Sequence, residues 1–313
     1  MKTLKFLFLA LVLVLAACNP SARTDATPTT TQPAPTAEPA PDPTDAAGTG
    51  LTEEVLRNAE YIFVEEDQPF LVRLTDGRYQ FGTDPDAEDY VSISLAEDVF
   101  AFGDLNGDGV QDAVVLLVET YGGTGVFVSL AAVLDQGGES RHVSTAFIDD
   151  RPIIYTVSIQ DGEILMDAVV HAPDDEMCCP SQAETRTYRL GARGLVLTQL
   201  TSQFEGGEKR IISIESPAAG SEVGRVFPLK GSVTIAPFEN TLVVKVFDAG
   251  ENQVYIGPLM VNAPDMGEPG TFDFSINLEG IALDSGPIRI EVADVSMADG
   301  SYLAMASVDV VLK

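Results

Sequence analysis

The sequence predicts a mainly β protein, with a β-rich α+β domain over residues 51–205 and an immunoglobulin-like β-sandwich over residues 211–313. Three observations lead to this prediction. Short apolar segments with a two-residue period recur through both regions, Asp-Gly pairs typical of turns separate several of them, and one segment near residue 52 has a helical pattern. The pair Gly206-Gly207 marks the expected boundary between the domains.

Residues 51–205 begin with a helical pattern and continue with strand patterns. Thr52 is a favourable N-cap residue, and acidic residues follow it in the first turn, where the helix dipole stabilises negative charge. Residues 114–118 are a continuous apolar run, which is typical of a buried strand. The other predicted strands are 70–81 around the turn pair Asp76-Gly77, 91–95, 153–170 around the turn pair Asp161-Gly162, 187–190 and 195–197.

Residues 211–313 alternate apolar and polar side chains more regularly. Over 288–292, apolar residues alternate with Arg289 and Glu291, so that each strand would bury one face. About seven such strands in roughly a hundred residues are typical of an immunoglobulin-like sandwich. The disulfide and the tryptophan of antibody domains are absent, so the pattern predicts the general architecture only.

Several short motifs of this C-terminal segment occur together in a known domain family. They are Ser216-Pro217, Gly-Ser-Glu-Val at 220–223, Leu-Lys-Gly at 229–231, Phe-Glu-Asn-Thr at 238–241, Gly-Thr-Phe at 270–272 and the turn Asp299-Gly300. With them, the segment resembles the immunoglobulin-like domain of bacterial spore-germination and related surface proteins, the Gmad families. The resemblance implies an extracytoplasmic interaction or spacer module with no known catalytic residues, and it does not imply sporulation.

The N-terminus has the pattern of an exported lipoprotein. Lys2 and Lys5 precede an apolar run that is too short to span a bilayer as a stop-transfer helix. The run ends Leu-Ala-Ala-Cys18, which resembles the lipobox of bacterial lipoproteins. The resemblance implies a signal peptide over 1–17, cleavage before Cys18, and acyl chains such as palmitate on this cysteine that anchor the protein extracytoplasmically to the cell membrane. The alternative is an ordinary signal peptide in which Cys18 is incidental.

Residues 18–50 are expected to be a disordered linker between the lipid and the folded part. From Ser21 to Gly50 the chain is almost entirely Thr, Pro, Ala, Asp and Gly, with too little apolar surface to offset the entropy of ordering. Its prolines favour an extended polyproline geometry of about 3.1 Å per residue.

The protein is strongly acidic. Its formal net charge is −30, which becomes about −32 once Lys2 and Lys5 leave with the signal peptide. Such a surface excludes nucleic acid as a natural partner, because phosphates would be repelled, and it favours cations.

The strongest local motif is an acidic loop over residues 104–112. Oxygen-bearing side chains stand at loop positions 1, 3, 5 and 9, glycine at position 6 allows a sharp turn, and position 7 offers a backbone carbonyl. Position 12 is Val115 rather than the glutamate of an EF-hand, and a strand pattern follows, so the loop resembles the calcium loops of FG-GAP repeats. The hypothesis is a structural calcium site, and the alternative is a turn without an ion. The expected ligands are Asp104, Asn106, Asp108, the Val110 carbonyl and Asp112.

The adjacent pair Cys178-Cys179 is the other unusual feature. One interpretation is a soft-metal site completed by His171, although adjacent cysteines rarely point at one ion. A second is a redox-active vicinal disulfide, and a third is a structural loop held by that disulfide or by two buried thiols. We favour the structural interpretation, because oxidising compartments use cysteines mostly for structure.

Three motifs of the first domain occur together in a family of lipoproteins. They are Gly-Asp-Leu-Asn-Gly-Asp-Gly at 103–109, Asp150-Arg151-Pro152, and His-x-Pro-Asp-Asp-x-x-Cys-Cys-Pro at 171–180. Together with the lipobox, they make residues 100–200 similar to the LppP/LprE-type lipoproteins. This resemblance implies a surface location more than a mechanism.

Two classes of function fit these features. The sequence holds two histidines and shows no Ser-His-Asp order, zinc-protease helix or cofactor fingerprint, so we expect no catalytic residues and no enzyme. The main hypothesis is a membrane-anchored binding or scaffold module of the cell envelope, with an envelope protein or a glycan as its ligand. The alternative is an envelope glycan hydrolase, which would need a deep cleft with two carboxylates about 5–10 Å apart.

Overall fold

The computed structural model describes residues 50–65 and 68–313, so the predicted signal peptide, Cys18 and the linker lie outside the described residues. Strands predominate in this part of the chain, and the fold class is mainly β as predicted. The expected helix is α1 (Glu53–Arg57), and Thr52 caps it by accepting a hydrogen bond from Val55 N at 3.3 Å. Within the described ranges, the helices are too short or too polar to cross a membrane.

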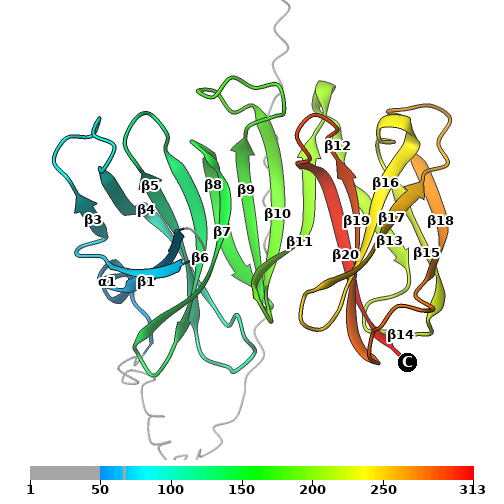
Figure 1. Cartoon of the computed structure of the whole chain (residues 1–313), viewed down its shortest axis with the longest axis horizontal. Helices are drawn as coiled ribbons and strands as arrows, with labels where there is room; N and C mark the ends of the chain where they lie inside the picture. Colours follow the sequence, from blue (N-terminus) through cyan, green and yellow to red (C-terminus); the bar gives the residue numbers. More distant parts are fainter. Residues whose placement is uncertain (1–49, 66–67) are drawn as a thin grey trace, which may run out of the picture. The chain divides into compact units, whose positions relative to one another are not determined.

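Two antiparallel sheets make up the first part of the chain (Figure 1). A two-stranded sheet pairs β1 (Glu60–Glu65) with β2 (Gln68–Arg73). In the second sheet each strand pairs with the next along the chain. Its five strands are β3 (Arg78–Phe81), β4 (Val91–Gly103), β5 (Asp112–Thr120), β6 (Phe127–Asp135) and β7 (Ser140–Asp150).

The central strand β5 is buried on both faces, as its apolar run predicts. On one face, Val115 and Leu117 belong to an apolar cluster with Leu56 of α1 and Tyr61 of β1. On the other face, Leu116 belongs to a second cluster together with residues of β9. The five-stranded sheet is therefore the middle layer of the first domain.

The turn pair Asp76-Gly77 does not close the hairpin that the sequence predicts. Both residues have positive φ (51° and 79°), and Thr75 and Arg78 exchange backbone hydrogen bonds across the turn. Beyond the turn the strands separate, because β2 pairs back with β1 and β3 pairs with β4. The predicted hairpin is wrong because β1, which the sequence patterns did not single out, offers β2 six residue pairs and so satisfies its backbone groups.

The third layer of the first domain consists of successive antiparallel strands. The predicted turn Asp161-Gly162 is confirmed, with φ of 53° and 81°, and joins the first two of them. The four strands are β8 (Ile153–Gln160), β9 (Glu163–Val170), β10 (Gln182–Gly191) and β11 (Gly194–Gln203).

The C-terminal domain is an immunoglobulin-like sandwich of two packed sheets. Side chains from both sheets, among them Leu229, Phe272, Leu242 and Ile290, form one buried cluster. One layer contains β13 (Ile212–Ser216), β15 (Val226–Val233) and β18 (Gly270–Asn277). The other contains β16 (Thr241–Phe247), β17 (Gln253–Met260), β19 (Gly286–Val295) and β20 (Tyr302–Leu312), with β14 (Glu222–Val223) beside β20.

A single ten-stranded sheet passes from the first domain into the sandwich. After β11 the chain runs through the short helix η1 (Glu205–Gly207) and β12 (Lys209–Arg210). β11 pairs directly with β20, through Gln199 opposite Ala306 and Leu200 opposite Met305. Leu200, Met305 and Ala293 form a small buried cluster at this junction. The described residues, 50–65 and 68–313, accordingly belong to one compact unit.

The strand β19 departs from the expected alternation, because both of its faces are buried from Ile288 to Asp294. The Arg289 guanidinium lies 2.9 Å from the Glu251 carboxylate and 3.0 Å from the Glu291 carboxylate. Glu291 also pairs with the Lys245 ammonium group at 3.1 Å. These charges tolerate burial because they pair with one another and because Arg189 of β10 reaches Glu251 at 3.4 Å from the neighbouring domain.

Candidate functional site

A groove opens on the part of the five-stranded sheet that the β1–β2 hairpin does not cover. Its cavity measures about 860 Å³, within the range of small-molecule sites. We call it the aromatic groove. It is lined by Ile62, Phe63, Val64 and Phe70 from the hairpin, by Tyr79, Phe81, Val91, Glu119, Tyr121, Ser129, His142, Val143, Ser144, Thr145 and Phe147 from the sheet and its turns, and by Arg193 from the β10–β11 turn.

The groove walls carry large aromatic side chains that are left in contact with solvent. Phe81 is 55% exposed and Phe147 is 60% exposed. The half-buried ring of Phe127, which is not itself a lining residue, lies 6.2 Å from that of Tyr121 and 6.4 Å from that of Phe147, measured between centroids. Exposed aromatic side chains in a groove are typical of binding surfaces, because covering them removes apolar area from water.

The polar groups of the groove are mostly satisfied within the protein. The buried Glu119 carboxylate accepts a hydrogen bond from the Tyr121 hydroxyl. Arg193 is exposed, and its guanidinium forms no hydrogen bond or ion pair with any residue in the described ranges. The groove therefore combines apolar walls with one available cationic side chain.

His142 attaches the hairpin wall of the groove to the sheet. Its Nδ1 accepts a hydrogen bond from Ile62 N at 2.9 Å, and its Nε2 lies 3.0 Å from the Ser144 carbonyl. Because Nδ1 accepts, the ring is neutral with its proton on Nε2. Burial lowers the pKa of His142 to about 4, although the Ser144 carbonyl favours the protonated ring.

The acidic loop brings together three of the five predicted calcium ligands. The Asp104 carboxylate accepts hydrogen bonds from the backbone of Asn106, Gly107 and Gly109. The Asn106 side-chain amide donates to the Asp108 carboxylate at 2.9 Å. The backbone N–H groups lower the pKa of Asp104, that of Gly109 contributing most.

Asp112 makes different contacts from these three side chains. It is fully buried, and its two carboxylate oxygens accept hydrogen bonds from Leu105 N at 3.0 Å and from Asp135 N at 2.9 Å. Burial raises its pKa, and the charges of Asp108 and Asp104 add to this effect. Asp112 thus ties the start of the loop to the end of β6.

No group of three or more His, Cys, Asp or Glu side chains is placed to hold a metal ion in the part of the chain that the structure describes. A cation at the acidic loop would therefore depend on the Asn106 amide oxygen and the Val110 carbonyl as well as on carboxylates. Hard cations accept such mixed oxygen sets, so the donor types present fit calcium.

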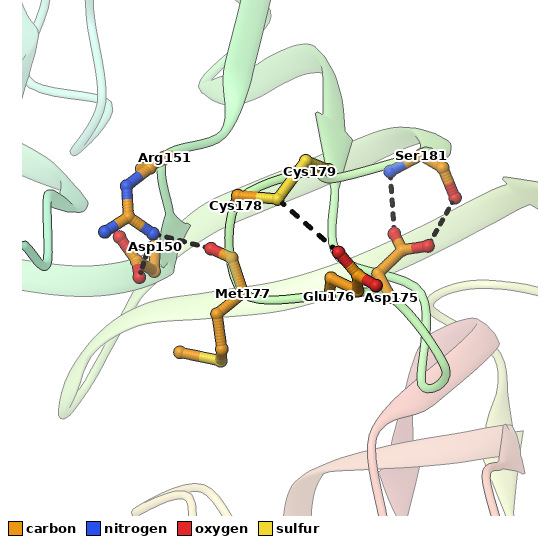
Figure 2. Close-up of a disulfide and its surroundings, with 8 residues drawn as sticks. All are labelled: Asp150, Arg151, Asp175, Glu176, Met177, Cys178, Cys179 and Ser181. Carbon is orange, nitrogen blue, oxygen red and sulfur yellow. Dashed lines mark hydrogen bonds and ion pairs between the residues drawn. A yellow bond between two sulfur atoms is a disulfide. The ribbon is translucent and has the colours of Figure 1, made fainter.

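The Asp150-Arg151-Pro152 motif lies beside the cysteine-containing motif at 171–180, although the two are distant in the sequence (Figure 2). Cys178 and Cys179 are joined in a disulfide, and both residues are exposed on the loop between β9 and β10. Arg151 donates to the Met177 carbonyl at 2.5 Å and pairs with Asp150 at 2.8 Å. A disulfide carries no thiolate, so the two sulfurs in this state are not metal ligands.

A second cavity of about 430 Å³ adjoins this loop and is lined by residues of both domains. His171 Nδ1 lies 2.9 Å from the Asp149 carboxylate, which connects the β9–β10 loop to the end of β7. Every carboxylate that lines the cavity already accepts hydrogen bonds from the protein. They are Asp149, Asp150, Asp175, Glu184 and Asp299.

The C-terminal domain has a recognisable relative. Residues 211–301 match the family described as the immunoglobulin-like domain of bacterial spore germination. The resemblance noted for this segment is therefore confirmed. A comparison with curated protein sequences finds no match.

The aromatic groove is the feature that the sequence reasoning missed. Its residues come from the β1–β2 hairpin, all five strands of the sheet and a distant turn, so they form no local motif. Phe81 and Phe147 are aromatic residues of strands, and only the structure shows that they lie outside the apolar clusters of the core. An aromatic residue at such a position becomes informative only once the strand faces are known.

Proposed function

We propose that the protein is a lipid-anchored lipoprotein of the bacterial cell envelope that acts as a binding module. The aromatic groove carries this proposal, because it is large, apolar and lined by exposed rings. The immunoglobulin-like domain would present the first domain at the cell surface or contact a further envelope component. The lipobox-like residues before Cys18 support the extracytoplasmic anchor.

The chemistry of the groove supports binding over glycan hydrolysis. Hydrolysis by paired acids requires two carboxylates on either side of the sugar bond. Among the residues that the structure describes, one carboxylate lines the groove, that of Glu119, and it accepts a hydrogen bond from the Tyr121 hydroxyl. We therefore propose that the aromatic groove binds a ligand without catalysing its hydrolysis.

A calcium ion at the acidic loop would have a structural role in this proposal. It would relieve the repulsion between Asp104 and Asp108 and stiffen the connection between β4 and β5. The groove and the loop would then be separate sites, because none of the groove-lining residues belongs to 104–112.

The binding proposal can be tested with the neutral apolar dye N-phenyl-1-naphthylamine. We expect its fluorescence to rise when residues 46–313 are added, and the Phe147→Ser variant to weaken this binding at least about tenfold. The matched control is Phe238→Ser, which removes an equally exposed phenylalanine, 62% exposed, from the sandwich. Equal dye binding by both variants would contradict the proposal.

The anchor is tested separately in cells that express the full chain. We expect the wild-type protein to partition into detergent, and Cys18→Ser to enter the aqueous phase or to persist as an uncut precursor. If the variant still partitioned into detergent like the wild type, the proposed lipid anchor on Cys18 would be wrong.

A further inference from the structure

We propose that the ligand of the aromatic groove is a long-chain fatty acid, with its acyl chain along the aromatic walls and its carboxylate paired with Arg193. This inference rests on the proposed binding function and specifies its ligand. It follows from the distribution of polar and apolar groups along the groove.

The groove offers few unpaired polar groups to a ligand along its length. His142 uses both ring nitrogens within the protein, and the Glu119 carboxylate accepts from Tyr121. A glycan laid in the groove would leave many of its hydroxyl groups without partners, and each unpaired polar group opposes binding. An acyl chain needs no such partners and gains from contact with Phe81 and Phe147.

Arg193 supplies a cationic group to the lining of the groove. Leu195 N donates to Ser144 Oγ at 2.8 Å, which holds the turn that carries Arg193 against the sheet strand β7. The charge of Arg193 also contributes to the lowered pKa of Asp248, but that carboxylate already accepts hydrogen bonds from the backbone of Gly250 and Asn252. The guanidinium keeps its donors, and their fork geometry matches a carboxylate.

The overall charge favours a singly charged ligand and disfavours the other occupants. A head group with two negative charges would be repelled more strongly by a chain of net charge −30. The same charge opposes a second copy of this chain in the groove. A single carboxylate is compensated locally by Arg193, since screening weakens charges beyond about 8 Å at physiological salt.

The test is displacement of N-phenyl-1-naphthylamine from residues 46–313 by palmitate, laurate and hexadecanol below their aggregation concentrations. A fully buried methylene strengthens binding by about fourfold, so palmitate should displace the dye at a concentration at least about tenfold lower than laurate. Hexadecanol has the same chain without the charge, and it should bind more weakly than palmitate.

Arg193→Gln should weaken palmitate binding by about fivefold or more while changing hexadecanol binding less than about twofold. The control is Arg141→Gln, which changes the net charge equally on β7 outside the groove lining and should leave both affinities unchanged. Equal effects of the two arginine variants would overturn the fatty-acid proposal.

The outcomes separate this inference from the function on which it rests. If dye binding depends on Phe147 but palmitate does not displace the dye, the fatty-acid proposal is wrong and the proposal of a binding groove is retained. If dye binding does not depend on Phe147, both proposals are wrong.

Discussion

Acidification should weaken the attachment of the hairpin wall of the aromatic groove, because it favours protonation of one buried side chain. His142 is 5% exposed, and its neutral Nδ1 accepts the hydrogen bond from Ile62 N. A protonated ring carries a hydrogen on both nitrogens, so this contact would place two donors against each other. The change to test is therefore a shift from pH 7 to pH 5, compared between the wild-type protein and His142→Gln.

The size of the effect follows from the pKa of about 4 in the folded protein against 6.5 for an ordinary histidine. The folded state disfavours the proton, so the contribution of His142 to stability is present above pH 6.5 and is lost as the pH falls towards 4. The full difference corresponds to about 3 kcal/mol, and about 2 kcal/mol of it is lost by pH 5.

The assay is urea unfolding of residues 46–313 at both pH values. Most of the 48 acidic residues of the full chain lie within residues 46–313 and titrate in the same region, so the informative quantity is the difference in unfolding free energy between wild type and variant. His142→Gln should be less stable at pH 7, by about 1–3 kcal/mol, and this gap should narrow by about 2 kcal/mol at pH 5. The protection factor of the Ile62 amide, which corrects for the slower intrinsic exchange at lower pH, should fall in the wild type over the same range. If the difference in unfolding free energy between the two proteins were the same at pH 7 and pH 5, the reasoning would be refuted.

Three further outcomes are expected. Serine at both Cys178 and Cys179 should lower the melting temperature and leave dye binding intact, whereas complete loss of a measured activity at an unchanged melting temperature would indicate redox chemistry. A chain of residues 211–313 should give a β-rich circular dichroism spectrum and melt below the two-domain protein, and a random-coil spectrum would contradict an independent domain. Calcium at about 10 mM should raise the melting temperature, because extracellular loops of this type bind in the range of about 10⁻⁴–10⁻³ M, and magnesium should do so poorly. An equal calcium shift in Asp108→Ala would mean that the loop is only a turn.

Local patterns predicted much of the secondary structure correctly. The Thr52 cap, the turn at Asp161-Gly162 and the buried strand β5 all appear where the sequence places them. In each case a few adjacent residues decide the outcome, through a side-chain cap, a left-handed turn or an uninterrupted apolar run. The sandwich was predictable for the same reason, since a period of two reveals which side chains share a face.

The errors arose where a distant segment decided the outcome. The turn at Asp76-Gly77 formed, yet β2 paired with β1 because that strand was present beside it. Arg289 and Glu291 alternate with apolar residues as surface residues do. Their burial is possible because Glu251, Lys245 and Arg189 of the neighbouring domain supply charged partners. Alternation separates the two faces of a strand, but it does not say what covers each face.

The sequence by itself therefore determined the mainly β class, the immunoglobulin-like domain, the acidic loop and the proximity of the two cysteines, because each depends on neighbours along the chain. Tertiary structure alone decided that Asp112 would hold two backbone N–H groups and that the β1–β2 hairpin would cover only part of a sheet. It also decided that Phe81, Phe147 and Arg193 would line one groove. Those outcomes depend on contacts between residues far apart in the chain, and no local pattern carries that information.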